Sequence, residues 1–257
     1  MAHSLTTQQI LSKIQKLEDY LNDMEMIPAT RQYRNWVILA LLSKALTVSR
    51  AICALVDSGF RAEAFATSRT LIEIFFSVRY ISNKDTEARA KTFADYEARV
   101  RQEWQTIIMK FYPNKPLSEI QLDDEVLEKA KEFKSKAHWT GYGGQAKLMA
   151  LEEDPLDLDA QGQPEKSEFD YDALYFWTSQ FVHATIAGIE AHISEPETVF
   201  RVRARSWLDN GRDEDALFNV AVILSKIFIK ACRVMNEDQP DVLHDLHKMI
   251  SGVANGF

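Results

Sequence analysis

Glycine and proline are scarce in this sequence: its 257 residues include only 9 glycines and 7 prolines. Sandwiches and barrels of β-strands need a turn about every ten residues, and those turns draw on glycine and proline. The scarcity therefore disfavours an all-β fold and favours long helices with few connections. No motif in the sequence is typical of a known reaction, so the sequence indicates the fold more clearly than the function.

Cysteine is also rare, which argues against a secreted protein held together by disulfides. The two cysteines, Cys53 and Cys232, both fall inside apolar helical runs, where reduced thiols are expected. The N-terminus lacks the charged-then-apolar pattern of a signal peptide, and no uncharged apolar run approaches the length of a membrane span. We therefore expect a cytoplasmic protein without membrane contact.

The sequence lacks an excess of positive charge. It has 30 Lys and Arg residues against 38 Asp and Glu residues, so the formal net charge is -8. This balance favours solubility and disfavours broad, non-specific binding to nucleic acid. Any nucleic-acid site must therefore be local.

Helical periodicity is what the sequence does contain. The segment 64–78 is apolar nearly all the way round, which is typical of a helix at the centre of a protein. Its only charged residues, Arg69 and Glu73, stand one turn apart on the same face. A charged pair inside a protein needs matching groups, so we expect partners for them on other helices.

The periodicity as a whole predicts an all-α fold in one domain, residues 1–257. The domain is a single helical bundle with two antiparallel, apolar central helices at 62–81 and 171–193. Amphipathic helices surround them. One of these, at 86–112, directs six large residues toward the core: Phe93, Tyr96, Val100, Trp104, Ile107 and Phe111.

Local signals set several boundaries. Thr6 and Gln9 have the spacing of a capping box at the start of the first helix, and Gly59 is a natural helix stop. The segment 153–169 is an acidic loop. The connection 195–212 is irregular, with an alternation near 199–206 that predicts a short strand or an extended loop.

A polar seam runs along the predicted helix 171–193, with five side chains within about a quarter-turn of one line. These are Asp172, Tyr175, Ser179, His183 and Glu190. Arg69 and Glu73 are natural partners for them. One interpretation is a pocket in which His183 is the general acid or base, Arg69 binds an anion, and Glu73 or Ser179 orients the imidazole. The other is a structural network that holds the helices in register.

Two further segments are candidate ligand contacts. In the glycine-rich stretch 138–144, the side chains of His138, Trp139 and Tyr142 could cover such a pocket; the alternative is that the glycines form a plain turn. The alternating residues Arg201, Arg203 and Arg205 could hold a phosphate or an acidic partner. Acidic neighbours could equally neutralise them.

Metal ligation receives little support. His244 and His247 lie three apart on the predicted terminal helix, with Asp241 a turn earlier, which suits metal binding by spacing alone. Nothing supplies the rest of a site, so we expect neither a metal nor another cofactor.

The set of motifs resembles a bacterial family of unknown function. The matching pieces are Arg69-Thr-Leu-Ile-Glu73 followed by Tyr80, then Trp139, then Tyr175, Ser179 and His183, within 62–187. The resemblance implies an all-helical fold and brings no known reaction. More distantly, the chain is similar to the HEPN helical ribonucleases and toxins, which use an Arg and a His. Here Arg69 would supply the guanidinium from a separate helix.

These observations lead to two functional hypotheses. The first is a helical binding or regulatory protein that recognises a protein or RNA partner through its polar pocket or its surface. The alternative is a metal-independent endoribonuclease, acting in phage defence or as a toxin, with His183 as acid/base and Arg69 on the phosphate. The many apolar helices also suggest a homodimer.

Overall fold

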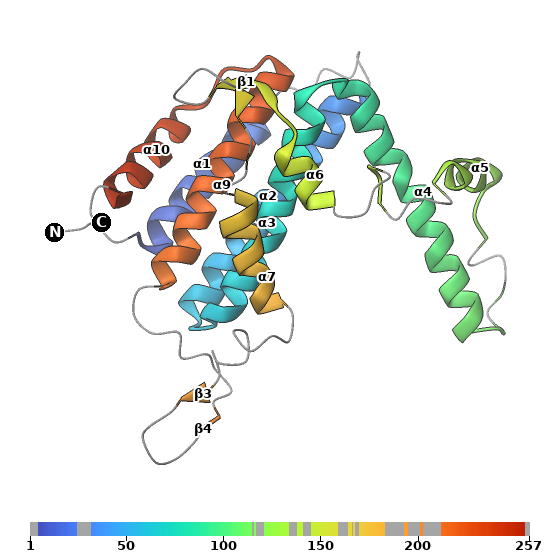
Figure 1. Ribbon diagram of the computed structural model, residues 1–257, viewed down its shortest axis with the longest axis horizontal. Helices are drawn as coiled ribbons and strands as arrows, with labels where there is room; N and C mark the ends of the chain where they lie inside the picture. Colours follow the sequence, from blue (N-terminus) through green and yellow to red (C-terminus); the bar gives the residue numbers. More distant parts are fainter. Residues whose placement is uncertain are drawn as a thin grey trace.

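The computed structural model describes residues 5–24, 32–114, 116, 121–133, 138–140, 145–158, 164–165, 167, 170–182, 193–194, 201–202 and 212–254. Helices make up most of this part of the chain, and they pack into a bundle (Figure 1). The prediction of an all-α helical bundle is therefore confirmed.

The helices of the first half are α1 (Thr7–Asp23), α2 (Tyr33–Asp57), α3 (Arg61–Asn83), α4 (Thr86–Phe111) and α5 (Asp124–Glu132). Those of the second half are α6 (Gln145–Leu151), the π-helix η2 (Asp170–Tyr175), α7 (Phe176–Val182), α9 (Arg212–Met235) and α10 (Asp241–Ala254). Short strands form two antiparallel pairs: β1 (Asp154–Leu158) with β2 (Pro164–Glu165), and β3 (Ile193–Ser194) with β4 (Arg201–Val202).

Capping chemistry fixes the start of α1 and the end of α2. Gln9 N–H donates to Thr6 Oγ1 at 3.3 Å while Thr6 N–H donates to Gln9 Oε1 at 2.9 Å, which is the predicted capping box. At the other boundary Gly59 adopts φ +77°. Its N–H donates to Val56 O and that of Phe60 donates to Leu55 O, a Schellman motif that turns the chain directly into α3.

The centre of the bundle is α3, as predicted, but its principal neighbours are α2 and α9. Along α9, Val220, Ile227 and Phe228 are fully buried. The predicted second central helix, 171–193, is wrong in its described part, because Phe176 is 57% and Val182 49% exposed. An apolar circumference in the sequence does not decide which helix is enclosed, since that depends on what packs over it.

The segment 170–182 also departs from a regular helix. It begins as the π-helix η2 and continues as α7, both packed on α3. The rings of Tyr171 and Tyr175 stack in η2 with centroids 5.4 Å apart and planes 17° apart. A π-helical turn is often found at functional sites because it re-aims side chains.

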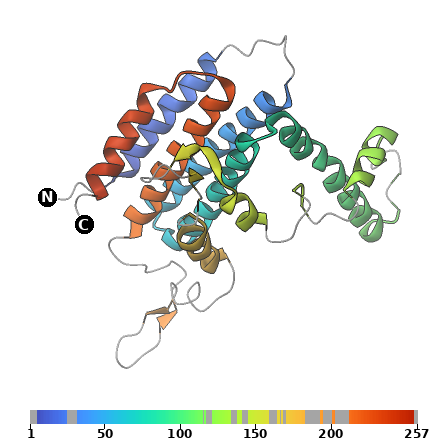
Figure 2. The ribbon, with the colours of Figure 1, turned by 45° about the horizontal axis from the view of Figure 1, so that its top comes forward.

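The second half of α4 leaves the bundle and carries α5 with it, as both ribbon views show (Figures 1 and 2). Phe93 and Tyr96 pack against the core, as predicted. The other four predicted core residues are exposed: Val100 44%, Trp104 62%, Ile107 45% and Phe111 66%. The prediction is wrong for these four, because periodicity defines a face of a helix without defining what covers that face.

The loop regions contain more order than the sequence suggested. The expected acidic loop at 153–169 includes the hairpin of β1 and β2. The strand-like expectation near 199–206 is confirmed at Arg201–Val202, which form β4.

Among the described helices, α2 is long and apolar enough to cross a membrane, judged by length and composition alone. Within its most apolar window, 56% of the residues are buried in the bundle. The core helix of a soluble protein passes the same test, so the finding does not establish a location.

The turn at Gly59 gives the first testable prediction. A Cβ at this position would meet no atom within 4 Å, so the positive φ is the only obstacle to a side chain. Gly59→Ala should lower the free energy of unfolding by about 1 kcal/mol, measured by urea denaturation. Gly59→Asn is the matched control and should cost less, because Asn tolerates the left-handed conformation. Equal losses in the two variants would contradict this explanation.

Candidate functional site

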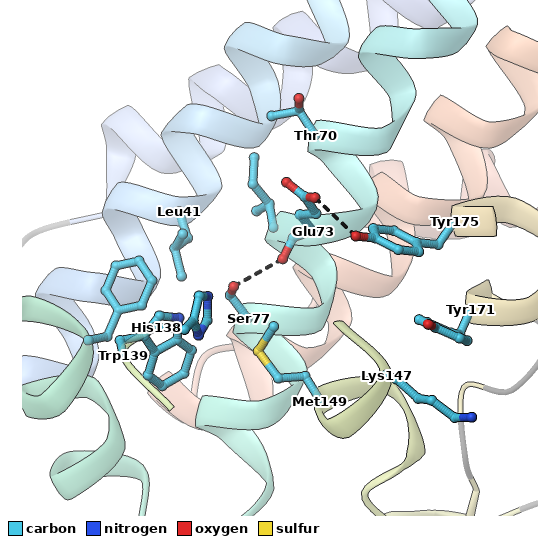
Figure 3. Close-up of a pocket in the computed structure, with 12 residues that line it drawn as sticks. Leu41, Thr70, Glu73, Ser77, His138, Trp139, Lys147, Met149, Tyr171 and Tyr175 are labelled. Carbon is cyan, nitrogen blue, oxygen red and sulfur yellow. Dashed lines mark hydrogen bonds between the residues drawn. The ribbon is translucent and has the colours of Figure 1, made fainter. Parts of the chain in front are cut away.

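A pocket of about 610 Å³ opens along one face of α3 (Figure 3). Four elements and a short segment surround it: α2, α4, α6, η2 and residues 138–139. The lining residues are Leu41, Thr70, Glu73, Ile74, Ser77, Phe93, His138, Trp139, Lys147, Met149, Tyr171 and Tyr175. This volume lies in the range of small-molecule sites.

The floor of the pocket is a polar row on α3. Thr70, Glu73 and Ser77 are spaced three and four residues apart, so they lie on one face of the helix. Ser77 Oγ donates to the backbone carbonyl of Glu73 at 3.0 Å. Of these three side chains, only that of Glu73 carries a charge.

Glu73 is held by Arg69 and Tyr175. Arg69 Nε donates to Glu73 Oε1 at 3.1 Å, and Arg69 Nη2 donates to the Tyr175 hydroxyl at 2.9 Å. That hydroxyl donates in turn to Glu73 Oε1 at 3.5 Å (Figure 3). The expectation of a partner from another helix is met by Tyr175. The expectation of a buried pair is wrong, because the side chain of Arg69 is 20% and that of Glu73 45% exposed.

Tyr175 remains a neutral donor in this arrangement. Burial raises the pKa of its phenol, the positive charge of Arg69 lowers it, and the charge of Glu73 raises it again, with a net increase. The Arg69 guanidinium also lies over the Tyr175 ring, 4.9 Å from its centroid. In the described part of the chain both partners bind Oε1 of Glu73, so Oε2 is available to a ligand or to water.

His138 and Trp139 lie at the end of the pocket opposite Tyr175 in Figure 3. Trp139 is 5% exposed and meets Phe93 and Tyr80 edge to face, with centroids 5.1 and 5.5 Å away. His138 Nδ1 accepts the backbone N–H of Thr140 at 3.3 Å. Burial lowers the pKa of His138, so the imidazole is neutral at pH 7 and its proton lies on Nε2.

The wall contributed by α6 is tied to α3 and α4 by its backbone and by Glu152. Arg79 Nη1 donates to Met149 O at 2.9 Å, and Asn83 Nδ2 donates to Glu153 O at 2.5 Å. Arg89 binds both carboxylate oxygens of Glu152, at 2.7 and 2.8 Å. These contacts hold Met149 and Lys147 at the pocket.

Some of the site residues predicted from the sequence line the pocket, and others do not or lie outside the described residues. His138, Trp139, Tyr175 and Glu73 line the pocket, and Arg69 is hydrogen-bonded to Glu73. Ser179 Oγ donates to the carbonyl of Tyr175 at 2.6 Å, so in this structure its hydroxyl is engaged within its own helix. Four predicted residues lie outside the described residues: Tyr142, His183, Arg203 and Arg205. For Arg201 only the backbone, in β4, is described.

The sequence analysis missed four polar or aromatic members of the site: Thr70, Ser77, Lys147 and Tyr171. The spacing of Thr70 and Ser77 around Glu73 was a readable signal, and Tyr171 lies one turn before Tyr175. No sequence pattern pointed to Lys147, because α6 is brought to the pocket by contacts with residues distant in the sequence.

Potential metal ligands do not gather in the part of the chain that the structure describes. No group of three or more His, Cys, Asp or Glu side chains there is placed to hold an ion. His244 and His247 are both exposed on α10.

The fold and the pocket define an all-α protein with an open, aromatic-walled site on its central helix. The chain belongs to a family of unknown function, DUF5677, whose family model matches residues 35–200. The resemblance to an uncharacterised family is thereby confirmed. No curated protein and no solved structure matches the chain. The more distant similarity to HEPN proteins gains no support from the family match and stays a prediction.

The exposure of Arg69 and Glu73 predicts a modest role in stability. Arg69→Met should lower the free energy of unfolding by about 1 kcal/mol, because Glu73 can turn to water. The matched contrast is Lys230→Met. Lys230 and Asp154 form an ion pair with side chains only 6% and 2% exposed, and its loss should cost roughly 3 to 5 kcal/mol. Urea denaturation of both variants checks this ranking, and the reverse order would contradict it.

The lowered pKa of His138 predicts a pH effect on stability. A neutral imidazole is favoured in the folded state, so its contribution is complete above the unfolded pKa of about 6.5 and is lost as the pH falls below that value. The free energy of unfolding of the wild type should fall between about pH 7.5 and about pH 5.5 by more than that of His138→Asn. The Asn amide oxygen can still accept the Thr140 N–H. Parallel pH profiles would show that His138 is not responsible.

Proposed function

We propose that this protein is a helical binding protein whose pocket on α3 takes a small, planar organic molecule that carries an N–H donor. The observation that carries the proposal is the Glu73 carboxylate, which is 45% exposed at the floor of the pocket. Hydrogen bonds from Arg69 and from Tyr175, which also lines the pocket, fix the orientation of this carboxylate. Because this carboxylate is already fixed in place, it can orient a bound ligand while losing little conformational entropy.

The walls support a planar ligand. Aromatic rings occur at both ends of the pocket, with Trp139 and Phe93 at one and Tyr171 and Tyr175 at the other. Pockets for small molecules combine such apolar walls with a few polar groups that fix orientation. Neutral His138 adds a donor, and Lys147 adds a positive charge at the edge.

The charge of the ligand follows from the same groups. Arg69 compensates much of the Glu73 charge, so the pocket does not require a full cation. An amine or a nitrogen heterocycle with an N–H group can bond to Glu73 Oε2 while its ring contacts the aromatic walls.

Binding can be measured with a panel of purine bases, indole amines and benzamidines, using the thermal unfolding midpoint and tryptophan fluorescence. At least one probe should raise the midpoint of the wild type, because it binds only the folded state. The increase should be lost in Glu73→Gln, whose amide removes one acceptor oxygen and the charge. It should persist in Glu97→Gln, where the replaced carboxylate is on α4 and 58% exposed. A panel without any effect, or an effect that survives in Glu73→Gln, would contradict the proposal.

The ribonuclease alternative requires Arg69 to hold a phosphate. In its present contacts the guanidinium is engaged with Glu73 and Tyr175, and the Glu73 carboxylate would repel a phosphate bound beside it. These features favour the binding protein. Expression of the wild type and of His183→Ala separates the two: growth arrest or RNA cleavage that disappears in the variant would support the enzyme instead.

A further inference from the structure

An exposed apolar stripe runs along the second half of α4, away from the pocket. It consists of Val100, Trp104, Ile107 and Phe111, with spacings of four, three and four residues. Such spacing places the side chains on one face and matches the core positions of a coiled coil. Their exposed fractions, 44%, 62%, 45% and 66%, are high for large apolar residues that adjoin one another.

The stripe is not the face on which α5 packs. Asp95 and Ala98 are buried on α4 beneath α5, together with Ala130 and Phe133 from the α5 end of the contact. At 100° per residue, Asp95 and Ala98 lie across the helix from Trp104. Figures 1 and 2 show α4 and α5 extending away from the bundle. The stripe therefore lies on an exposed face of a projecting arm, opposite α5.

We infer that the stripe is a self-association surface, on which α4 of a second copy packs in the antiparallel direction. The spacing is the same when read from either end, so a two-fold axis near residue 105 pairs Val100 with Phe111 of the second copy. The same axis pairs Trp104 with Ile107 of the second copy. Each pair matches a smaller with a larger side chain, and the same patch serves both subunits.

Charge complementarity selects the antiparallel direction. Glu103 and Lys110 flank the stripe on the same side, seven residues apart, and both are exposed. Antiparallel pairing brings Glu103 of one copy beside Lys110 of the other. The two copies of Glu103 remain distant from each other, and so do the two copies of Lys110. Flanking pairs of opposite charge set the orientation of paired helices. Within one chain, Lys110 lies over the Phe111 ring and Glu103 bonds to Arg99.

The contact depends chiefly on the aromatic residues. Trp104 lies next to the two-fold axis, so the indoles of both copies lie at the apolar centre of the interface. Tryptophan is enriched among the residues whose loss weakens an interface most. The contact area of two half-helices is below that of a standard interface, so the dimer should be concentration-dependent.

The test is the mass of the full-length protein over a range of concentrations, by sedimentation or light scattering. The wild type, 29.5 kDa as a monomer, should approach twice that mass as the concentration rises. Trp104→Glu should remain a monomer with an unchanged unfolding midpoint, because its side chain is exposed in one copy. Thr106→Glu is the matched control, because Thr106 is exposed on α4 outside the stripe, and it should dimerise like the wild type.

Charge exchange tests the direction of pairing. Glu103→Lys and Lys110→Glu should each raise the dimer dissociation constant about tenfold, and the double exchange should restore it, because the facing pair is then re-formed in reverse. A wild type that is monomeric at every concentration would overturn the inference, as would a dimer that Trp104→Glu leaves unchanged. Failure of the double exchange to restore association would overturn the antiparallel pairing.

Discussion

The burial of charged and polar groups on α3 is the constraint on which the rest of the structure depends. Arg79 is only 2% exposed, so its guanidinium must find acceptors inside the protein. It finds one at the carbonyl of Met149, and Asn83 finds another at the carbonyl of Glu153. A short helix such as α6 would not be stable alone. Here it is fixed because a buried charge on the central helix requires its backbone.

The pocket is a consequence of this anchoring. Two lysines of α9 bind two elements that follow α6 in the chain: Lys230 bonds to Asp154 at the start of β1, and Lys226 bonds to Asp170 at the start of η2. Together with Arg79, these contacts hold short elements over α3 without closing the space between them. A site whose walls are fixed before binding loses little freedom on binding, which favours recognition of a small molecule.

Apolar surface is used differently in the two parts of the molecule. In the bundle, α3 is packed against α2, α9, η2, α6 and α7. On the α4 arm, the described residues place α5 over one face and leave Trp104 and Phe111 on the opposite face exposed. The pocket and the stripe are therefore separate features: the planar small molecule that we propose would bind in the first, and the second copy of α4 that we infer would pack on the second.

The sequence by itself determined the elements and their local chemistry. Scarce glycine and proline, the capping box at Thr6 and the stop at Gly59 indicated long helices and their ends, because these signals act within a few residues. The apolar circumference of segment 64–78 placed α3 at the centre. The sequence also identified Glu73 and Tyr175 from their places on helical faces, and His138 and Trp139 from the glycine-rich stretch, as candidate site residues. Only the tertiary structure decided which faces are covered. It exposed Trp104, enclosed α9 and left Glu73 half in water, because burial is a property of contacts between distant segments and periodicity records only one helix at a time.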